Sequence, residues 1–287
     1  MLEDVSKAAF SILGGSVLLK RLASRYGMLR DDSFARRFVA GQTIQEAIAA
    51  ARQIEASGLT ITLDHLGEQV ATTEAATAAT RDYLAIIPEM TAAGIGRNLS
   101  VKLTQLGIDV DRATSVDNLR RIFEAGLKAD FFVRVDMEKS IYTELTLDAF
   151  ETLWRIGYER TGIAIQACLR RSASDIDRLN AMGASVRLVK GAYVERDAHP
   201  WGEATDRAYA ELARRLHAHG VDVALATHDE RLQDVLPRAR VELLLGVRPD
   251  LARRLASQGR DVRIYVPYGA DWFRYFMRRR AEAQGAA

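Results

Sequence analysis

The chain has 287 residues, of which 48% are hydrophobic, so it can bury a large core in one or two domains. Its 40 basic and 38 acidic residues nearly balance, and this overall charge does not predict a nucleic-acid partner. A single cysteine, Cys168, excludes an intramolecular disulfide framework and favours a reducing compartment. The sequence has no apolar run of about 18 residues and no secretory-type N-terminus, which predicts a cytoplasmic protein.

Residues 1–57 have a helical pattern throughout, which is clearest over residues 43–56 (TIQEAIAAARQIEA). Thr43 followed by Glu46 has the spacing of a capping box and predicts a helix start, and Ser172 followed by Asp175 predicts another. No Pro-rich or Ser-rich linker separates this segment from the rest. We therefore expect residues 1–57 to pack on a single catalytic domain formed by residues 58–287.

Short strand-like runs, most of them rich in Val, Ile and Leu, alternate with helical stretches along the rest of the chain. They cover residues 58–66, 98–106, 130–136, 162–169, 184–193, 222–228, 241–247 and 261–267. Strict alternation of strand and helix predicts a parallel sheet, and eight such units favour a closed (β/α)8 barrel of the TIM type. An open doubly wound sheet is the alternative, but no G-x-G-x-x-G motif follows the first run.

Polar residues lie inside these apolar runs or at their ends, where a parallel barrel gathers its chemistry. They are Asp64, His65, Lys102, Asp136, Gln166, Arg187, Lys190, Tyr193, Thr227, His228 and Tyr265. Because a buried charge is costly unless it is paired, this pattern predicts a polar barrel mouth. Lys102 is then a Schiff-base nucleophile, an anchor for an anion, or a structural partner of Asp136. His228 is either a pocket donor or a satisfied structural histidine.

The last run is followed by a helix with an unusual inner face. Trp272, Tyr275, Arg279 and Glu282 share one stripe at about 100° per residue, with Arg278 on its flank. An Arg fork binds a carboxylate through two hydrogen bonds, so adjacent arginines beside aromatic rings favour a pocket for an anionic small molecule. The alternative is a solvated helix in which Glu282 pairs with one of the two arginines.

These motifs together resemble the proline dehydrogenase family in its monofunctional bacterial form. The residues that carry the resemblance are Tyr268-Gly-x-x-Trp272-x-x-Tyr275-x-x-Arg278-Arg279-x-x-Glu282, Arg187-Leu-Val-Lys190-Gly-Ala-Tyr193, and the shorter matches SVKLTQLG, RVDME and ATH at 100–107, 134–138 and 226–228. The resemblance implies a distorted barrel with its last helix over the mouth, and non-covalently bound FAD. It also implies oxidation of L-proline to 1-pyrroline-5-carboxylate, the first step of proline catabolism.

The partners follow from the same resemblance. Electrons pass from the flavin to a membrane quinone, so the cytoplasmic protein meets the inner face of the membrane only peripherally. The product is the substrate of a pyrroline-5-carboxylate dehydrogenase, so a separate enzyme of that kind is a candidate partner. No metal is expected.

The resemblance also assigns site residues by position. The substrate set is Lys102, Leu245, Tyr265, Tyr275, Arg278 and Arg279. In it the two arginines hold the proline carboxylate with Lys102 as a third cation, the other residues wall the ring, and Glu282 supports the arginines. The cofactor set is Met137, Gln166, Arg187, Val189, Lys190, Gly191, Ala192, Thr227 and His228. Asp136 and Arg187 are assigned to catalysis, Asp136 as a positioning residue near the cations and Arg187 beside flavin N5.

One departure and two rival interpretations remain. Some relatives carry Trp where this chain has Val194, which puts one aromatic contact to the cofactor in doubt. Tyr265 resembles the form specific for proline over hydroxyproline. A class I aldolase-like barrel would use Lys102 or Lys190 as a Schiff-base nucleophile and the arginines as a phosphate site. A barrel that only binds an anionic metabolite is the non-enzymatic alternative.

Overall fold

The computed structural model describes residues 33–193 and 195–285, with side chains as far as residue 279. The helical pattern expected over residues 1–32, and the departure at position 194, lie outside the described residues. Between 33 and 57 the chain forms a 3-10 helix, η1 (Phe34–Arg37), and helix α3 (Ile44–Ala56), with an irregular stretch between them. The predicted capping box is confirmed, since the Thr43 hydroxyl accepts from the Glu46 amide and the Glu46 carboxylate accepts from the Thr43 amide.

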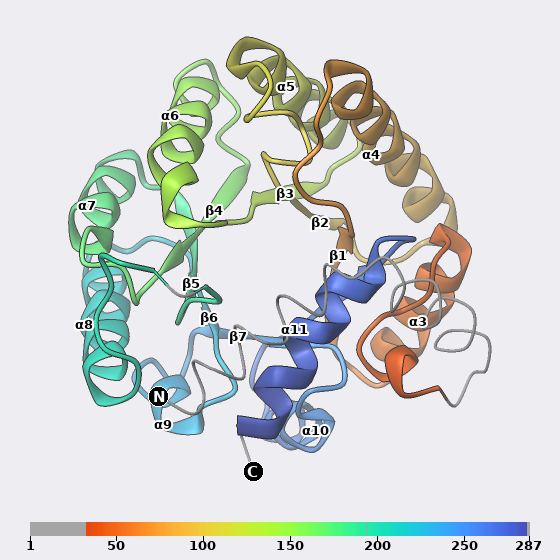
Figure 1. The fold of residues 1–287 in the computed structure, drawn as a ribbon. Helices are drawn as coiled ribbons and strands as arrows, with labels where there is room; N and C mark the ends of the chain where they lie inside the picture. The colour runs from red at the N-terminus through yellow and green to blue at the C-terminus, as the bar shows by residue number, and fades with distance from the viewer. Residues whose placement is uncertain (1–32, 194, 286–287) are drawn as a thin grey trace.

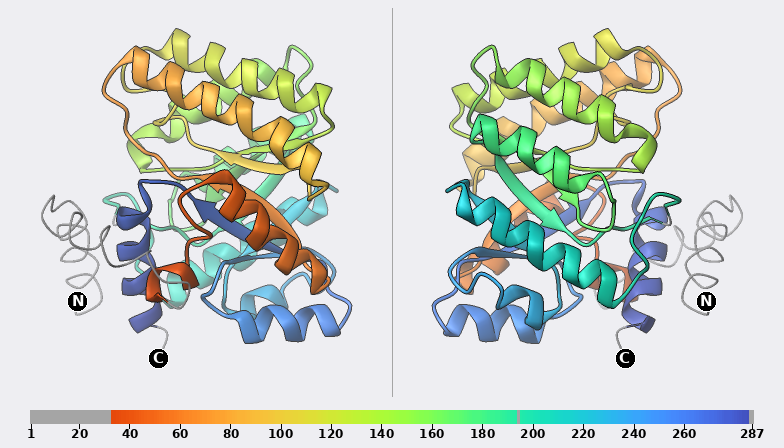
Figure 2. Two further views of the ribbon diagram at one scale, coloured as in Figure 1. Left: turned by 90° about the vertical axis from the view of Figure 1, so that its right-hand side faces the viewer. Right: turned by 90° about the vertical axis from the view of Figure 1, so that its left-hand side faces the viewer.

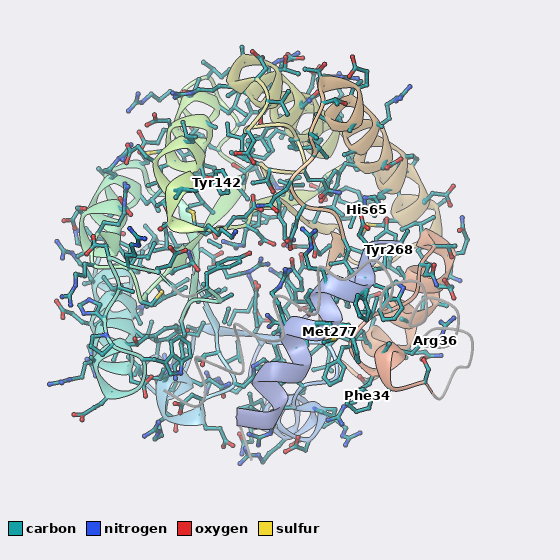
Figure 3. The ribbon with its side chains drawn as sticks, viewed as in Figure 1. Phe34, Arg36, His65, Tyr142, Tyr268 and Met277 are labelled. Carbon is teal, nitrogen blue, oxygen red and sulfur yellow. The ribbon has the colours of Figure 1, made fainter. Side chains whose placement is uncertain are left out.

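Parallel strands close into a barrel in which each strand pairs with the next in sequence order and β8 pairs with β1. The strands are β1 (Thr60–His65), β2 (Asn98–Val101), β3 (Phe132–Val135), β4 (Thr161–Gln166), β5 (Ser185–Val189), β6 (Val223–Ala226), β7 (Arg240–Leu244) and β8 (Val262–Tyr268). The seam between β1 and β8 is in register from Thr60 with Arg263 to His65 with Tyr268. At its end the rings of His65 and Tyr268 lie 5.2 Å apart (Figure 3). The barrel prediction is confirmed, and the closed seam excludes the doubly wound alternative.

Helices surround the strands as an outer ring (Figure 1). Besides α3 they are α4 (Thr73–Ala93), α5 (Arg112–Lys128), α6 (Thr143–Trp154) after the 3-10 helix η2 (Ser140–Tyr142), α7 (Ser172–Met182), α8 (Glu203–Ala218), α9 (Glu230–Gln233) and α10 (Pro249–Ser257). Each predicted run overlaps one strand, but several strands end earlier than predicted, so residues 102–106 and 190–193, for example, lie beyond β2 and β5. Ser172 does not cap α7 as predicted, because its hydroxyl donates to the carbonyl of Gln166, at the end of β4, at 2.6 Å.

Helix α11 (Trp272–Gly285) does not join the outer ring. It crosses the end of the barrel at which the strands have their carboxyl ends, here called the mouth (Figures 1 and 2). An ion pair joins Arg278 on α11 to Glu68, which follows β1 at that end. The expected position of the last helix over the mouth is therefore confirmed.

A second apolar cluster, separate from the main barrel core, fastens α11 to the segment that precedes the barrel. Its buried members are Ala35, Phe38, Val39, Leu66, Trp272, Phe273, Tyr275 and Phe276. The Phe276 ring lies 6.3 Å from Phe38 and 5.9 Å from Trp272. The Ala40 amide donates to the Pro267 carbonyl at 2.8 Å, which ties this segment to the end of β8. Trp272, which shares the polar stripe in sequence, is thus a packing residue.

We predict that this cluster holds α11 in place. Phe38→Ala should lower the free energy of unfolding by about 3–5 kcal/mol, because the side chain is fully buried. Ile156→Ala is the control, since this side chain is 64% exposed and lies outside the cluster, and it should change stability by less than about 1 kcal/mol. Chemical unfolding of both variants measures the difference. A loss below about 1 kcal/mol for Phe38→Ala would show that the segment before α3 does not fasten the helix.

Candidate active site

Charged side chains fill the barrel interior at the mouth. The Lys102 ammonium, just beyond β2, lies 2.6 Å from Asp64 Oδ1 and 3.2 Å from Asp136 Oδ2. All three side chains are buried. Buried ions are tolerated only when they are paired, so these residues depend on one another. The pairing of Lys102 with Asp136 is confirmed, and Asp64 is a second partner.

The charges decide how this group is protonated. Burial by itself would lower the pKa of Lys102, but Asp64, Tyr265 and Asp136 raise it well above its ordinary value. Burial would raise the pKa of Asp136, but Lys102 and Arg187 hold it below its usual range. Complete burial raises the pKa of Asp64 in spite of the Lys102 charge. Lys102 is therefore an ammonium at neutral pH and has no lone pair with which to attack a carbonyl group.

Arg187 on β5 is held on two edges by carboxylates. Its Nη1 donates to Asp136 Oδ1 at 2.7 Å and to Ser100 Oγ at 2.9 Å, and its Nε donates to Glu242 on β7. Its Nη2 is buried and has no hydrogen-bond partner within the described part of the chain. A buried donor without a partner marks a place where a ligand or a water molecule completes the hydrogen bonds.

Glu242 lies one layer deeper in the barrel than the residues at the mouth. It is level with Arg263 on β8, two residues before Tyr265, and its Oε1 lies 3.3 Å from Arg263 Nη1. Burial would raise the pKa of Glu242, but the charges of Arg187, Arg134 and Arg263 outweigh it and hold the pKa at about 2. Glu242 is therefore a carboxylate at any physiological pH.

Tyr265 on β8 is oriented by the same charges. Its hydroxyl donates to Asp136 Oδ2 at 2.6 Å and accepts from Lys102 Nζ at 3.1 Å. The Arg187 guanidinium carbon lies 5.3 Å from the ring centroid, within the range of a cation–π contact. The phenol is fixed from three directions, which makes it a rigid wall at the mouth.

Helix α11 presents two arginines to the mouth in different ways. Arg278 donates both Nη atoms to the two carboxylate oxygens of Glu68, and Arg279 is 7% exposed with its guanidinium carbon 5.2 Å from the Tyr275 ring centroid. Burial would lower the pKa of Arg278, but Glu68 raises it, so the fork stays charged. The side chain of Glu282 lies outside the described side chains. Its support of the arginines stays a prediction, and Glu68 is the carboxylate found on Arg278.

The loops that follow β4 and β5 lie side by side and form a close backbone turn. Gln166 Nε2 donates to the Glu138 carbonyl at 2.8 Å, and its Oε1 accepts from the Ala192 amide at 3.4 Å. Gly191 has φ +134°, and a Cβ there would lie 2.3 Å from Cys168 Sγ. Only glycine fits this position, so the backbone passes close to its neighbours without a side chain.

Lys190 and Thr227 complete this side of the mouth at the ends of β5 and β6. Lys190 Nζ lies 2.7 Å from Asp206 Oδ1 and 3.4 Å from Asp229 Oδ2. The Thr227 hydroxyl accepts from the Asp229 amide at 3.2 Å. Lys190 is thus oriented by two carboxylates, which leaves it poorly suited to Schiff-base chemistry.

His228 is partly satisfied by the fold. Its Nε2 accepts from the Leu244 amide at 3.1 Å. Burial, together with the charges of Arg279 and Arg248, lowers the pKa of His228 to about 4. A neutral ring that accepts at Nε2 carries its proton on Nδ1, so a single N–H donor remains for a ligand. The structural interpretation of this histidine is thus supported, and its donation to a ligand stays a prediction.

The remaining predicted residues contribute packing and backbone contacts. Met137 and Leu245 pack against the main hydrophobic core, and the Val189 carbonyl accepts from the Ala167 amide at 2.8 Å. Glu68, Ser100 and Glu242 were not predicted. Glu242 left a signal, since it is the one carboxylate in an otherwise apolar strand (VELLLGV). Glu68 left none, because it lies in a loop.

A sequence model of proline dehydrogenase matches residues 47–287. The chain belongs to the proline dehydrogenase family. Proline dehydrogenase 1 of Bacillus subtilis is 35% identical over 286 residues, which cover 95% of this chain and 93% of that relative. Proline dehydrogenase of Deinococcus radiodurans is 35% identical over 267 residues, which cover 87% of this chain and 86% of that relative.

A solved structure has the same barrel. Proline utilization A from Bdellovibrio bacteriovorus superposes with a TM-score of 0.79 at 24% identity, over 85% of this chain and 32% of that longer chain. At this identity the likeness supports the fold alone. Among the helices that the structure describes, none has the length and apolar character needed to cross a membrane.

Glu138 gives the site a pH-dependent component. Its carboxylate accepts from the Thr104 amide at 3.0 Å and from the Thr104 hydroxyl at 2.5 Å, and its carbonyl holds the Gln166 amide. Burial raises the pKa of Glu138 from 4.5 to about 7, against the lowering effect of these hydrogen bonds. The folded state therefore binds this proton more tightly than the unfolded chain does.

We predict that Glu138→Gln reduces the pH dependence of stability. Because the folded-state pKa is raised, the wild type loses stability as the pH rises from about 4.5 to about 7, by roughly 2–3 kcal/mol. A neutral glutamine mimics the protonated acid at every pH, so the variant should lose less over this range. Urea unfolding at several pH values measures this. Glu89→Gln, at an exposed carboxylate, is the control, and identical pH profiles for Glu138→Gln and the wild type would contradict the prediction.

Proposed function

We propose that this protein is a flavin-dependent proline dehydrogenase that oxidises L-proline to 1-pyrroline-5-carboxylate. Membership of the family supports the reaction. The observation that carries the proposal in this chain is the arrangement at the mouth, where Arg187 keeps one buried donor without a partner below a helix that presents Arg278 and Arg279. The free donor of Arg187, for a cofactor, and the arginines of α11, for a carboxylate, would thus face the same space at the mouth.

The residues at the mouth fit FAD. A bound flavin supplies the acceptor for two electrons, which the side chains of this protein cannot provide. Arg187 has a donor to spare for the ring, and the glycine-only turn at Gly191 lets backbone amides approach an anionic diphosphate. Gln166, Val189, Lys190 and Ala192 would line this side. Met137, Thr227 and His228 would complete it, the last through its Nδ1–H.

The arginines of α11 suit the substrate carboxylate. Arg278 binds the carboxylate of Glu68 through one N–H of each Nη atom, so a substrate carboxylate would use its remaining N–H donors or take the place of Glu68. Arg279 would add a second fork and Lys102 a third positive charge. Tyr265, Tyr275 and Leu245 would wall the ring of proline, and Glu282 would support the arginines. Contacts to the carboxylate of proline, together with the walls around its ring, would hold the ring in one orientation, which is the main task of the protein in this reaction.

The residues between the two sites would act by position. Asp136 touches Lys102, Arg187 and Tyr265. It would therefore set the relative positions of the lysine that binds the substrate carboxylate, the arginine that donates to the cofactor and the tyrosine that walls the pocket. In this reaction the ring CH2 beside the nitrogen would give up a hydride to the flavin and the nitrogen would lose a proton to solvent, so no protein nucleophile is required. The protonated state of Lys102 argues against the aldolase alternative.

The partners are part of this proposal. Electrons would pass to a membrane quinone met at the membrane surface. The product would pass to a separate pyrroline-5-carboxylate dehydrogenase. The bifunctional protein PutA of Escherichia coli matches over 180 residues at 32% identity, and this chain covers only 14% of it.

The purified protein should therefore be yellow. Proline added without oxygen should bleach the flavin absorption, because the substrate hydride reduces the ring. A visible spectrum before and after proline, with hydroxyproline as a comparison, is the measurement. A colourless protein that takes up no FAD and is trapped on a lysine by borohydride with a carbonyl substrate would favour the aldolase. FAD binding without any reduction by proline would rule out the proposed reaction.

The carboxylate site predicts a separation of substrate and cofactor effects. Arg278→Ala and Arg279→Ala should each raise the KM for proline by roughly thirtyfold or more, since a lost charged contact is worth about 2–5 kcal/mol. The flavin content should stay at the wild-type level. Arg274→Ala, on the exposed face of the same helix, is the matched control and should leave KM unchanged. A near-normal KM in both arginine variants would remove the carboxylate assignment.

A further inference from the structure

Glu242 has no role in the proposed substrate or cofactor sets, yet it is among the most constrained side chains of the barrel. Its side chain is 1% exposed, and its two oxygens bind different arginines, Arg187 and Arg263. It is in register with Arg263 on β8, two residues before Tyr265, and so lies below the residues at the mouth. Because its side chain is buried and both of its oxygens are bound, Glu242 would affect a ligand at the mouth through Arg187.

Two carboxylates fix the plane of the Arg187 guanidinium. Glu242 takes the Nε proton and Asp136 takes a proton from Nη1, so two different edges of the group are held. A long arginine side chain has many rotamers, and a single contact would leave the group free to turn. With both edges held, the direction of the remaining Nη2 donor is determined. Glu242 therefore helps to set where that donor points.

Glu242 also sets how much positive charge remains on Arg187. Asp136 cannot offset this charge alone, because it is shared with Lys102 at 3.2 Å. Arg134 lies nearby and is fully buried, and it donates to the Ile163 and Ser185 carbonyls and to the Ser185 hydroxyl, all of which are neutral. Glu242 is thus the carboxylate that pairs with both Arg187 and Arg263, and it also feels the charge of Arg134.

We propose that Glu242 is a positioning residue that orients Arg187 and, by offsetting its charge, lowers the reduction potential of the flavin. The inference rests on the proposed function. Reduction adds electrons to the ring, so positive charge beside it favours reduction and a carboxylate that offsets this charge opposes it. Arg187 touches the cofactor in this view, and Glu242 acts only through Arg187.

The low pKa of Glu242 agrees with this role. Its three arginine neighbours hold the pKa at about 2, so its charge is constant over the range in which the enzyme works. A fixed charge gives a fixed effect on the potential. The contribution of Glu242 should therefore not vary with pH.

Two substitutions at Glu242 separate the effect of its charge from the effect of its side-chain length. Glu242→Gln keeps the side-chain length and an oxygen that can accept from Arg187 Nε, but removes the charge. It should make two-electron reduction of the flavin about tenfold more favourable, a positive shift of about 30 mV. Glu242→Asp keeps the charge but is one methylene shorter. It should leave the potential nearly unchanged and lower kcat with little effect on the KM for proline.

A third substitution, at Arg263, should shift the flavin potential in the opposite direction. Arg263→Gln removes a competitor for Glu242, so more of the carboxylate charge should fall on Arg187 and the potential should shift in the negative direction. This variant also decides the question if Glu242→Gln does not fold, because Arg263 retains some access to solvent and is less deeply buried. Glu151→Gln is the control, since this buried carboxylate pairs with Arg155 and Arg178 on the outer helices.

The midpoint potential of the bound flavin is measured by reduction in equilibrium with a reference dye, on holoenzyme of verified flavin content. Opposite shifts for Glu242→Gln and Arg263→Gln, with none for Glu151→Gln, would support the proposal. If both potentials equal that of the wild type while proline still reduces the flavin, Glu242 is structural only and the proposed function stands. If the wild type binds no flavin or is not reduced by proline, the proposed function fails first.

Discussion

The ion pairs of Arg187 are the interaction on which the rest of the site depends. This guanidinium is almost completely buried, and it can stay charged there only because β3 supplies Asp136 and β7 supplies Glu242. Asp136 in turn stabilises Lys102 and orients Tyr265. The barrel must be closed for these strands to face one another. The charged interior is therefore a property of the finished fold, and no local segment contains it.

Much of the fold could be predicted because its signals are local. Eight apolar runs with helical stretches between them are visible in any window of the sequence, and the Thr43 capping box depends on residues three positions apart. The ends of strands were harder, since Lys102 lies inside a predicted run yet falls beyond the end of β2, where it pairs with Asp64 of the neighbouring strand β1. Ser172 has the right spacing for a cap, but its hydroxyl donates to the carbonyl of Gln166 at the end of β4.

The site could be predicted as a list of residues more readily than as a set of contacts. The motif on α11 marks Arg278, but its partner Glu68 is 210 positions away and lies in a loop with no pattern of its own. The single stripe proposed for that helix also divides in space. Trp272 packs in the second apolar cluster, while Arg279 lies at the mouth against Tyr275. Periodicity fixes which residues share a face, and only the neighbours decide what that face contacts.

The order in which the chain is synthesised gives the position of α11 a further meaning. The strand that closes the seam and the helix that covers the mouth are the last described elements of the chain, and they pack on residues near 38 and 68. While the C-terminal segment is still inside the ribosome, β1 has an unpaired edge and the mouth has no arginines above it. A nascent chain at this stage therefore cannot form the complete site. Assembly of the site must wait until β8 and α11 have left the ribosome, and until then the open edge of β1 is the part most in need of protection from aggregation.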